Sequence, residues 1–566
     1  MKYTADFETI VDSEKTRIWA WGICEIGNNY KFNYGNSDKT FIEWVKSLNK
    51  STKVYFHNLK FDGKFLLYML HKFGYEFHKK ENEKDRYLPA GKYTTLINAD
   101  GGMWYSVKLC TKRKGKNPVI IEFLDSSKII PSSVERIAKD FGLEEQKGEL
   151  DYKEYREVGH ELTPDEVDYL SRDVIIMAKA LNIMFDKKLT KMTIGSNALS
   201  SFKQDFKSYE YKQKFPILNY DRDIRQSYRG GWTYCKKDKK EKDLGKVMSL
   251  DVNSLYPWAM YDNLLPVGEG IPFRGEYEYD PLYPLYIMQV QLNFEIKKDH
   301  LPCIQIKDSF YNSTEWLESS GYNYPVICIT NIDWELIKDH YDLYNVEILG
   351  GWKFKGERDL FKNYIDFWMA EKIKATKEHN PSMRAISKLM LNNLYGKFGS
   401  KPYAREKYPA FDNDGFLHLV DSELMEKDPV YVPIASFITS YARNKTIRTA
   451  QSLYDRFVYS DTDSIHLLGW DMPDNIEIHD TKLGAWAFED YAIRARYIGA
   501  KCYYEDIIRD DEVIKSVKVA GLPDYLHEQV TWENFHVGAR YRGKLRPKDV
   551  LGGVYLEEID YVIRKR

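Results

Sequence analysis

The chain has 566 residues with 83 basic and 85 acidic side chains, and its net charge of −2 by itself argues against a nucleic-acid partner. A composition of 43% hydrophobic and 30% charged residues supports large buried cores and excludes disordered and collagen-like proteins. No apolar run is long enough to span a membrane, and the six cysteines contain no CxxC pair, which argues against a zinc site or a disulfide framework.

The first 190 or so residues are predicted to form an α/β module, because β-rich runs at 18–23, 54–56 and 119–123 alternate with helical stretches. Three short sequence motifs with carboxylates follow one another in this module. Their members are Asp6 and Glu8 at a strand end, Asp62 in HNLKFDG, and Tyr169 with Asp173 on one helical face. Each piece alone is more often a solvated carboxylate or a helix cap. Together they offer the oxygen ligands that hard divalent cations need.

A second acidic group is divided between distant segments. Asp251 follows the predicted strand at 247–250 and begins DVNSLYP, whereas Asp461 and Asp463 lie in YSDTDS between β-rich flanks. A DxD sequence alone is typical of a turn. If the three carboxylates meet, their repulsion costs several kcal/mol unless cations neutralise it. The alternatives are therefore a turn and a compact metal site.

Between these two segments, residues 361–398 are predicted to form two antiparallel helices. Asn380 suits the N-cap of the second helix and Pro381 suits its first turn. Lys388, Asn392 and Tyr395 are spaced at i, i+4 and i+7, so they share one helical face. A basic and aromatic face suits a nucleoside triphosphate, which offers phosphates and a base. Otherwise Lys388 is solvated and Tyr395 belongs to the core.

The last 40 residues are predicted to be β-rich and basic. Five cations alternate with other residues in this segment: Arg540, Arg542, Lys544, Arg546 and Lys548. On a strand they would share one face and repel one another unless an anion lies opposite, which favours contact with phosphates. The alternative is a solvated edge strand that lysines protect from pairing.

Taken in order, DxxSLYP, KxxxNxxYG and YxDTDS resemble the three polymerase motifs of family B DNA polymerases. Tyr228, Gly230 and Gly231 resemble the YxGG motif that links exonuclease and polymerase modules, and Lys501 and Tyr503 resemble the KxY motif that holds the primer terminus. The acidic pieces of the first module resemble the DxE, NxxxD and YxxxD boxes of the proofreading 3′–5′ exonuclease. Over nearly its whole length the chain is similar to the protein-primed, phi29-like DNA polymerases of small bacteriophages.

This resemblance implies an α/β and α+β multidomain fold, with an RNase H-like exonuclease domain before a right-hand polymerase that carries two subgroup insertions. The implied division is as follows: exonuclease 1–193, first part of the palm 194–262, insertion contacting the terminal protein 263–360, fingers hairpin 361–398, β-hairpin insertion for processivity and strand displacement 399–432, second part of the palm 433–522, and thumb 523–566.

For synthesis, the resemblance implies that Asp251 and Asp463 hold two metal ions, with Asp461 close by and required. The primer 3′-hydroxyl would attack the α-phosphate in line and release pyrophosphate. Tyr256 would lie under the sugar, and Tyr395 would pack against the incoming base pair. The implied nucleotide-binding residues are Tyr256, Lys372, Lys374, Lys388, Asn392, Tyr395 and Gly396, where the choice between Lys372 and Lys374 stays open.

For proofreading, the resemblance implies that Asp6, Glu8, Asp62 and Asp173 hold two further metal ions. Tyr169 would orient the attacking water, and Lys147 would assist catalysis. The frayed 3′ end would be held by Thr9, His57, Asn58 and Phe61, with Phe61 stacked on a base. The other implied DNA contacts are the YxGG and KxY residues and the five C-terminal cations.

The predicted function is DNA-directed DNA synthesis with proofreading, in which strand-displacing replication of a linear phage genome starts from a protein hydroxyl. The expected cofactor is Mg²⁺ or Mn²⁺, two ions per active site. Expected partners are template and primer DNA, deoxynucleoside triphosphates, a terminal protein in a 1:1 heterodimer and, as a further candidate, a phage single-stranded DNA-binding protein. The expected location is the cytoplasm of the infected bacterium, with no membrane association.

Two alternatives remain. The first is a family B polymerase that extends only nucleic-acid primers, since it would share every catalytic motif. The second is a DNA-binding scaffold with inactive sites. Such a scaffold would have lost carboxylates, whereas all seven expected ones are present.

Overall fold

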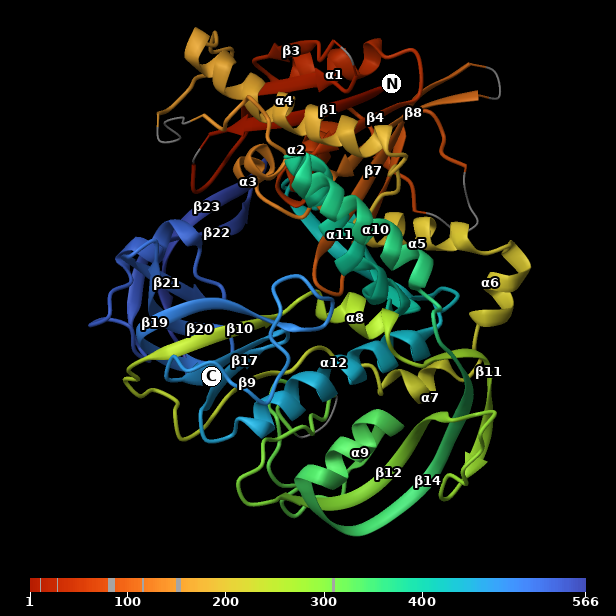
Figure 1. Ribbon diagram of the computed structural model, residues 1–566. Coiled ribbons are helices and arrows are strands. Elements are labelled where there is room, and N and C mark those ends of the chain that lie inside the picture. Colours follow the sequence, from red (N-terminus) through yellow and green to blue (C-terminus); the bar gives the residue numbers. More distant parts are fainter. Residues whose placement is uncertain are drawn as a thin grey trace.

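The structure is a computed structural model that describes residues 1–10, 12–27, 29–79, 87–114, 117–148, 154–307 and 311–565. Within these residues the strands form four sheets of ten, seven, four and two strands. Figure 1 shows the first module at the top and the four-stranded sheet at the bottom, with the helices α10 (Lys362–Lys377) and α11 (Pro381–Phe398) between them. No helix in the described part of the chain is both long and apolar enough to cross a membrane.

The first module is an α/β unit, as predicted. Its strands are β1 (Lys2–Thr9), β2 (Ile18–Glu25), β3 (Phe32–Gly35), β4 (Thr52–Phe56), β5 (Glu76–Phe77), β6 (Lys92–Asn98), β7 (Met103–Lys114) and β8 (Asn117–Asp125). Its helices are α1 (Asp38–Ser47), α2 (Leu59–Lys72), η1 (Ser126–Lys128), α3 (Val134–Asp140), α4 (Pro164–Asp186) and α5 (Ile194–Phe202). The central strand β1 pairs antiparallel with β2 and parallel with β4. Because helices cover both faces of the sheet, β2 is buried along nearly its whole length.

The seven-stranded sheet joins segments that are far apart in the chain, in the order β21-β20-β19-β10-β18-β17-β9. Its strands are β9 (Thr233–Cys235), β10 (Val247–Val252), β17 (Phe457–Asp461), β18 (Ser464–Leu468), β19 (Trp486–Gly499), β20 (Cys502–Arg509) and β21 (Glu512–Val519). Further helices are η2 (Lys203–Asp205), α6 (Ser208–Lys214), α7 (Asp221–Arg225), α8 (Leu255–Tyr261) and α12 (Val432–Ser452), of which α12 contacts β18 of this sheet. The predicted strand at 247–250 is confirmed as β10, and the β-rich flanks of YSDTDS are the strands β17 and β18.

The segment after α8 forms a separate four-stranded sheet in the order β11-β14-β12-β13. Its elements are β11 (Leu265–Arg274), β12 (Leu285–Ile296), β13 (Val326–Thr330), α9 (Asn331–His340) and β14 (Tyr341–Glu357). A buried ion pair connects this sheet to α12, where Arg443 donates to Asp333 at 2.8 Å. The Arg443 guanidinium also donates to the carbonyls of Arg229 and Gly230, so it fixes the YRGG segment.

The predicted helical hairpin is confirmed. Asn380 caps α11 by accepting a hydrogen bond from the backbone N–H of Met383 at 3.0 Å, and Pro381 occupies the first turn. The tip of the hairpin contacts the first module, where Ser382 Oγ donates to the carbonyl of Phe141 at 2.6 Å.

The next segment is a β-hairpin of β15 (Tyr403–Phe411) and β16 (Leu417–Glu426). It extends the sheet of the first module, because Glu406 pairs with Asn98 on β6. The ring of Phe411 stacks on His71 of α2 at 3.9 Å. The hairpin is therefore attached to the first module.

The C-terminal segment contains η3 (Asp524–Gln529), β22 (Arg540–Val550) and β23 (Gly553–Val562). Its strands pair antiparallel, but the register shifts between Tyr541 and Lys544. This extra residue reverses the alternation of faces, so Lys544, Arg546 and Lys548 lie on the face opposite to Arg540. The prediction that all five cations share one face is wrong for this reason.

Candidate active sites

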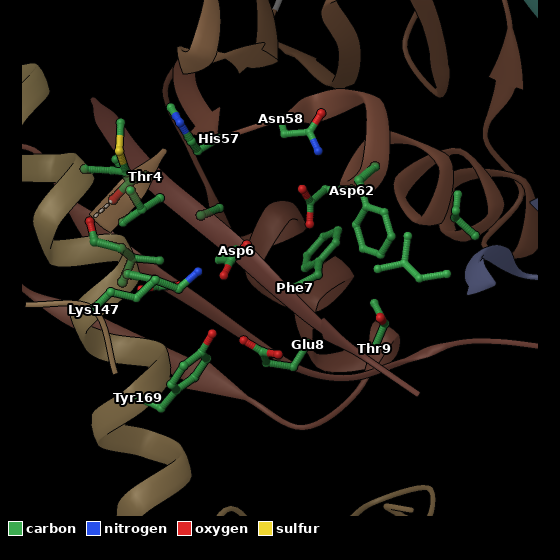
Figure 2. A pocket seen from close by; sticks show the side chains of 18 of the residues that line it. Thr4, Asp6, Phe7, Glu8, Thr9, His57, Asn58, Asp62, Lys147 and Tyr169 are labelled. Atoms are coloured by element: carbon green, nitrogen blue, oxygen red, sulfur yellow. Dashed lines mark hydrogen bonds and ion pairs between the residues drawn. The ribbon is translucent and has the colours of Figure 1, made fainter. Parts of the chain in front are cut away.

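A cavity of about 720 Å³ lies beside β1 in the first module. Four predicted carboxylates line it: Asp6 and Glu8 from β1, Asp62 from α2, and Asp173 from α4. Figure 2 shows Asp6, Glu8, Asp62 and Tyr169 arranged around this space. Lys147 reaches the same cavity, with its Nζ 3.7 Å from Asp173 Oδ2.

Burial and mutual repulsion weaken the acidity of these carboxyls. Burial, followed by the charge of Asp173, raises the pKa of Asp6 to about 7. Burial, followed by the charge of Asp6, raises the pKa of Glu8 and of Asp62 well above their usual range. Burial raises the pKa of Asp173 despite Lys147. One buried oxygen of Asp62 and one of Asp173 accept no hydrogen bond from the described residues. A positive charge close to these carboxyls would favour their ionised form.

The donor set suits hard divalent cations, which bind carboxylate oxygens. In the described part of the chain, however, no three His, Cys, Asp or Glu side chains are arranged to hold a metal ion as they stand. The carboxylates are neighbours around a cavity rather than a preformed coordination shell. Their unpartnered buried oxygens and raised pKa values are what bound cations would relieve.

The residues predicted to hold a frayed strand also line this cavity: Thr9, His57, Asn58 and Phe61. His57 is held in place by contacts of its ring nitrogens with the Ser126 hydroxyl at 3.0 Å and the Ser132 carbonyl at 2.6 Å. Asn58 adopts a left-handed conformation, with φ of 85°, where α2 begins. This turn directs the chain from β4 into the helix that carries Asp62.

One wall of the cavity was not predicted. The C-terminal segment contributes Tyr525, Leu545, Val554, Leu556 and Glu558. Leu545 pairs with Glu558 across β22 and β23, so both lie on the face opposite to Lys544 and Arg546. The segment is held there by a backbone hydrogen bond from Thr16 to Leu551 at 2.9 Å. No sequence signal indicates this wall, because the residues are apolar or isolated and lie some 500 positions from β1.

The second acidic group meets on the seven-stranded sheet. Asp251 on β10 and Asp461 on β17 both pair with Ser464, so their side chains point to one face. The N–H of Val252 donates to the carbonyl of Asp463 at 2.7 Å, which fixes Asp463 beside Asp251. Thr462, with φ of 68°, makes the tight turn between the two aspartates. The DTD segment is therefore a turn, and its two aspartates belong to an acidic cluster with Asp251. That this cluster holds metal ions stays a prediction.

Burial, then Asp463 and Glu489, raises the pKa of Asp251 to about 7. Burial also raises the pKa of Asp463, with Asp461 and Glu489 contributing. Asp461 is already paired, because Thr233 donates to it at 2.9 Å and Lys501 Nζ lies at 3.2 Å. Glu489 was not predicted. It lies where the register of β10 and β19 shifts, a feature that no motif marks.

The predicted nucleotide face lies next to these carboxylates. Tyr256 and Tyr395 stack with their ring centroids 4.0 Å apart, and the charge of Lys388 acts on Asp251. Burial, then the charges of Arg384 and Lys388, lowers the pKa of Lys372, so Lys372 lies beside Lys388. Lys374 is exposed, as are Asn392 and Gly396 on α11.

The YxGG residues pack tightly around the second site. A side chain at Gly231 would lie 2.5 Å from Thr462, and one at Gly399 would lie 2.3 Å from the ring of Tyr228. Gly230 has open space around it. Beyond the acidic cluster, Tyr503 lies within a group of buried aromatic rings, at 5.2 Å from Tyr459.

Comparison with known proteins agrees with this geometry. The profile of DNA polymerase type B, organellar and viral, matches residues 45–481. The chain is 42% identical to the DNA polymerase of Bacillus phage phi29 over 99% of each chain, and 32% identical to that of Streptococcus phage Cp-1 over 100% of this chain and 98% of the relative. The structure of phi29 DNA polymerase complexed with primer-template DNA superposes with a TM-score of 0.94, at 40% identity and over 100% of both chains. The chain belongs to the type B DNA polymerases, among the phi29-like phage enzymes.

Proposed function

We propose that this DNA polymerase copies a DNA template from a primer hydroxyl on a terminal protein and removes misincorporated nucleotides at a separate 3′–5′ exonuclease site. The observation that carries this proposal is the presence of two separate acidic groups, one in the first module and one on the seven-stranded sheet. Asp251, Asp461 and Asp463 meet on the seven-stranded sheet, whereas Asp6, Glu8, Asp62 and Asp173 line the cavity of the first module. The group on the seven-stranded sheet lies beside residues suited to binding a nucleotide. The group in the first module lies beside residues suited to binding a single strand.

At the synthesis site, Asp251 and Asp463 would hold two divalent cations, Mg²⁺ or Mn²⁺, which supply charge neutralisation when bound. Lys388 and Lys372, which lie close together, would hold the triphosphate. The stacked rings of Tyr256 and Tyr395 would support the sugar and base of the incoming nucleotide. Lys501 and Tyr503 would hold the primer terminus. With the reactants fixed in this way, positioning provides much of the catalysis.

At the exonuclease site, the four carboxylates of the cavity would hold two cations, and Tyr169 would orient a water molecule. Lys147, next to Asp173, would stabilise charge that develops on the phosphate. Phe61 and His57 offer rings to the terminal bases. The apolar wall from the C-terminal segment would cover the strand on the other side.

The remaining segments are assigned by the same proposal. The division into exonuclease, palm, fingers and thumb follows the boundaries given above, with the insertion at 263–360 contacting the terminal protein and the hairpin at 399–432 separating strands. Solved structures of phi29 DNA polymerase contain primer-template DNA and incoming nucleotides, and we assign the same ligands to this chain. The terminal protein would form a 1:1 complex in the host cytoplasm, with a single-stranded DNA-binding protein acting on displaced DNA.

Protein priming is tested by incubating the purified chain with terminal proteins from several phi29-like phages, labelled dATP and Mg²⁺ or Mn²⁺. We expect a covalent nucleotide–protein adduct that resists denaturation. Asp463→Asn is the matched control, because it keeps the fold and removes one carboxylate from the synthesis site. Extension of DNA primers with no adduct on any terminal protein would favour a nucleic-acid-primed polymerase instead.

A further inference from the structure

A closed cluster of buried polar groups lies beneath the synthesis site, and none of the roles assigned above uses it. Glu505 Oε1 accepts hydrogen bonds from the Tyr497 hydroxyl and from Nδ1 of His466, the latter at 2.8 Å. The same Nδ1 lies 2.9 Å from the Tyr497 oxygen. All three residues are almost completely excluded from solvent. Burying a carboxylate is costly, so its retention here calls for an explanation.

The cluster supports the ring of Tyr503 directly. Tyr503 lies 5.4 Å from His466 and 5.5 Å from Tyr497, measured between ring centroids. Tyr497 is also the cross-strand partner of Tyr503 between β19 and β20. Glu505 is two residues from Tyr503 on β20, so both side chains point to the same face of the sheet. The ring of Tyr503 therefore packs beside His466 and Tyr497, on the face of the sheet that also carries Glu505.

The same cluster lies one row from the catalytic carboxylates. His466 pairs with Ser249 on one side and with Tyr459 on the other. Two residues along these strands, Ser464 pairs with Asp251 and Asp461. Side chains two residues apart on a strand share a face and are separated by about 6.6 Å. His466 therefore lies in the row next to Asp251 and Asp461, on the same face of the sheet.

Lys501 is connected to the cluster through Tyr459. Its backbone N–H donates to the Tyr459 hydroxyl at 2.9 Å, and it adopts a left-handed conformation with φ of 54°. The Tyr459 ring in turn stacks on Tyr497 at 5.3 Å. Both members of the KxY pair thus depend on the same buried group.

Charge strengthens the cluster. Burial opposes the charge on Glu505, yet the neighbouring His466 brings the pKa of Glu505 below its usual range. Burial likewise opposes charge on His466, but Glu505 raises the pKa of His466. An ion pair with an added hydroxyl donor fixes the orientation of each ring more strongly than apolar packing, which permits rotation and sliding.

We propose that Glu505, with His466 and Tyr497, is a positioning residue for the primer terminus: it holds Tyr503 and Lys501 in the geometry that grips the 3′ end. This inference rests on the proposed role of Lys501 and Tyr503. Glu505 acts through those residues and does not touch substrate.

The test uses Glu505→Leu, which keeps much of the volume and removes the acceptor, together with Glu505→Gln, which keeps an oxygen acceptor. Steady-state extension of a matched primer-template is measured, with thermal unfolding to verify folding. For Glu505→Leu we expect the apparent KM for primer-template to rise about tenfold with kcat within about twofold of the parent, and for Glu505→Gln we expect recovery to within about threefold. The 3′ end should also partition toward degradation in Glu505→Leu.

Tyr497→Phe is a milder second variant that decides the question if Glu505→Leu does not fold. Its matched control is Tyr341→Phe, which removes a buried hydroxyl that donates to Leu317 at 2.7 Å in the four-stranded sheet. Tyr497→Phe should raise the KM for primer-template, and Tyr341→Phe should not. Folded variants with a parental KM would overturn the inference.

Lys501→Ala and Tyr503→Phe distinguish the positioning role of Glu505 from the proposed primer-binding role of Lys501 and Tyr503. If these two changes raise the KM and the cluster variants do not, the positioning inference fails and the proposed function stands. If Lys501→Ala and Tyr503→Phe leave the KM unchanged, the assignment of the primer grip fails, and the inference built on it fails as well.

Discussion

Asp6 and Asp251 each carry a carboxyl whose pKa is raised to about 7, although they belong to different sheets. The cause is the same in both places, since burial and a neighbouring carboxylate disfavour the charged form. Raised carboxyl pKa values of this kind are typical of functional sites. The two sites differ in what surrounds them, because an apolar wall faces Asp6 and a lysine-bearing helix faces Asp251.

We expect a substitution in one acidic site to abolish one activity and to leave the other activity unchanged. Asp251→Asn should reduce primer extension by about 10³-fold or more and leave degradation of a labelled single strand within about twofold, because only the synthesis site loses a ligand. Asp173→Asn should have the opposite effect. Both activities are measured on the same preparation. Loss of both from a single change in a folded protein would contradict the division into two sites.

Repulsion among the cavity carboxylates should also be visible in stability. A raised folded pKa means that ionisation destabilises the folded state, so stability is highest below the unfolded value near 4 and falls as pH rises through about 7. In chelator at pH 8, Asp62→Asn should therefore raise the melting temperature by about 2–4 °C. The gain should disappear at pH 5.

Differential scanning calorimetry or dye-based melting measures this effect, and Glu528→Gln, at an exposed carboxylate, is the control. Mg²⁺ at pH 8 should stabilise the parent more than Asp62→Asn. An unchanged melting temperature for Asp62→Asn at pH 8 would show that the four carboxylates do not repel one another appreciably.

Capping residues at the start of individual helices set the positions of several of the site residues. The capping box of Thr163 and Glu166 begins α4, so Tyr169 and Asp173 follow at fixed turns of the helix. Asn380 and Pro381 begin α11 in the same way and set the phase of Lys388 and Tyr395. The alternating sequence of β22 does not predict its faces, because one extra residue at a bulge reverses them and the alternation contains no sign of it.

The helix α10 offers two lysines, Lys372 and Lys374, as contacts for the triphosphate. Lys372 lies beside Lys388 and Arg384, whereas Lys374 is exposed on another side of the helix. Lys372→Ala should raise the KM for the incoming nucleotide by about tenfold or more, and Lys374→Ala should change it by less than about threefold. Single-nucleotide insertion kinetics measure both variants. The reverse order would assign the triphosphate to Lys374.

At the scale of the whole molecule, a segment from the opposite end of the chain forms one wall of the cavity in the first module. The end of β22 contacts α2, where Tyr68 donates to the carbonyl of Val550 at 3.3 Å, and β22 and β23 add an apolar face to the acidic site. The hairpin of β15 and β16 extends the sheet of the same module. Both contacts connect the first module to segments expected to surround DNA during synthesis.

The cavity wall is tested with Leu545→Asn. Replacing an apolar wall residue by a polar one should lower degradation of single-stranded DNA about fivefold, because the strand loses apolar contact beside the carboxylates. Insertion of one nucleotide on a primer-template should change by less than about twofold in kcat. Val513→Asn, at an exposed apolar residue of β21, is the matched control. If Leu545→Asn and Val513→Asn had equal effects on degradation, the wall residue Leu545 would have no specific role at the cavity.

Much of this protein is determined by short-range sequence patterns. The alternation of strands and helices, the caps at Asn380 and Pro381, and the spacing of Lys388, Asn392 and Tyr395 all depend on residues within one or two turns of one another. The order of the acidic motifs identified the family and both groups of carboxylates. The near-zero net charge was uninformative, because it averages basic surfaces with acidic sites.

Only the tertiary structure decided the features that depend on contacts between distant segments. The apolar wall at Leu545, the position of Glu489 at a register shift, the split of the C-terminal cations and the cluster of His466, Tyr497 and Glu505 have no local pattern. The physical reason is that sheet pairing brings together residues tens to hundreds of positions apart. One inserted residue in a strand then reverses which side chains meet.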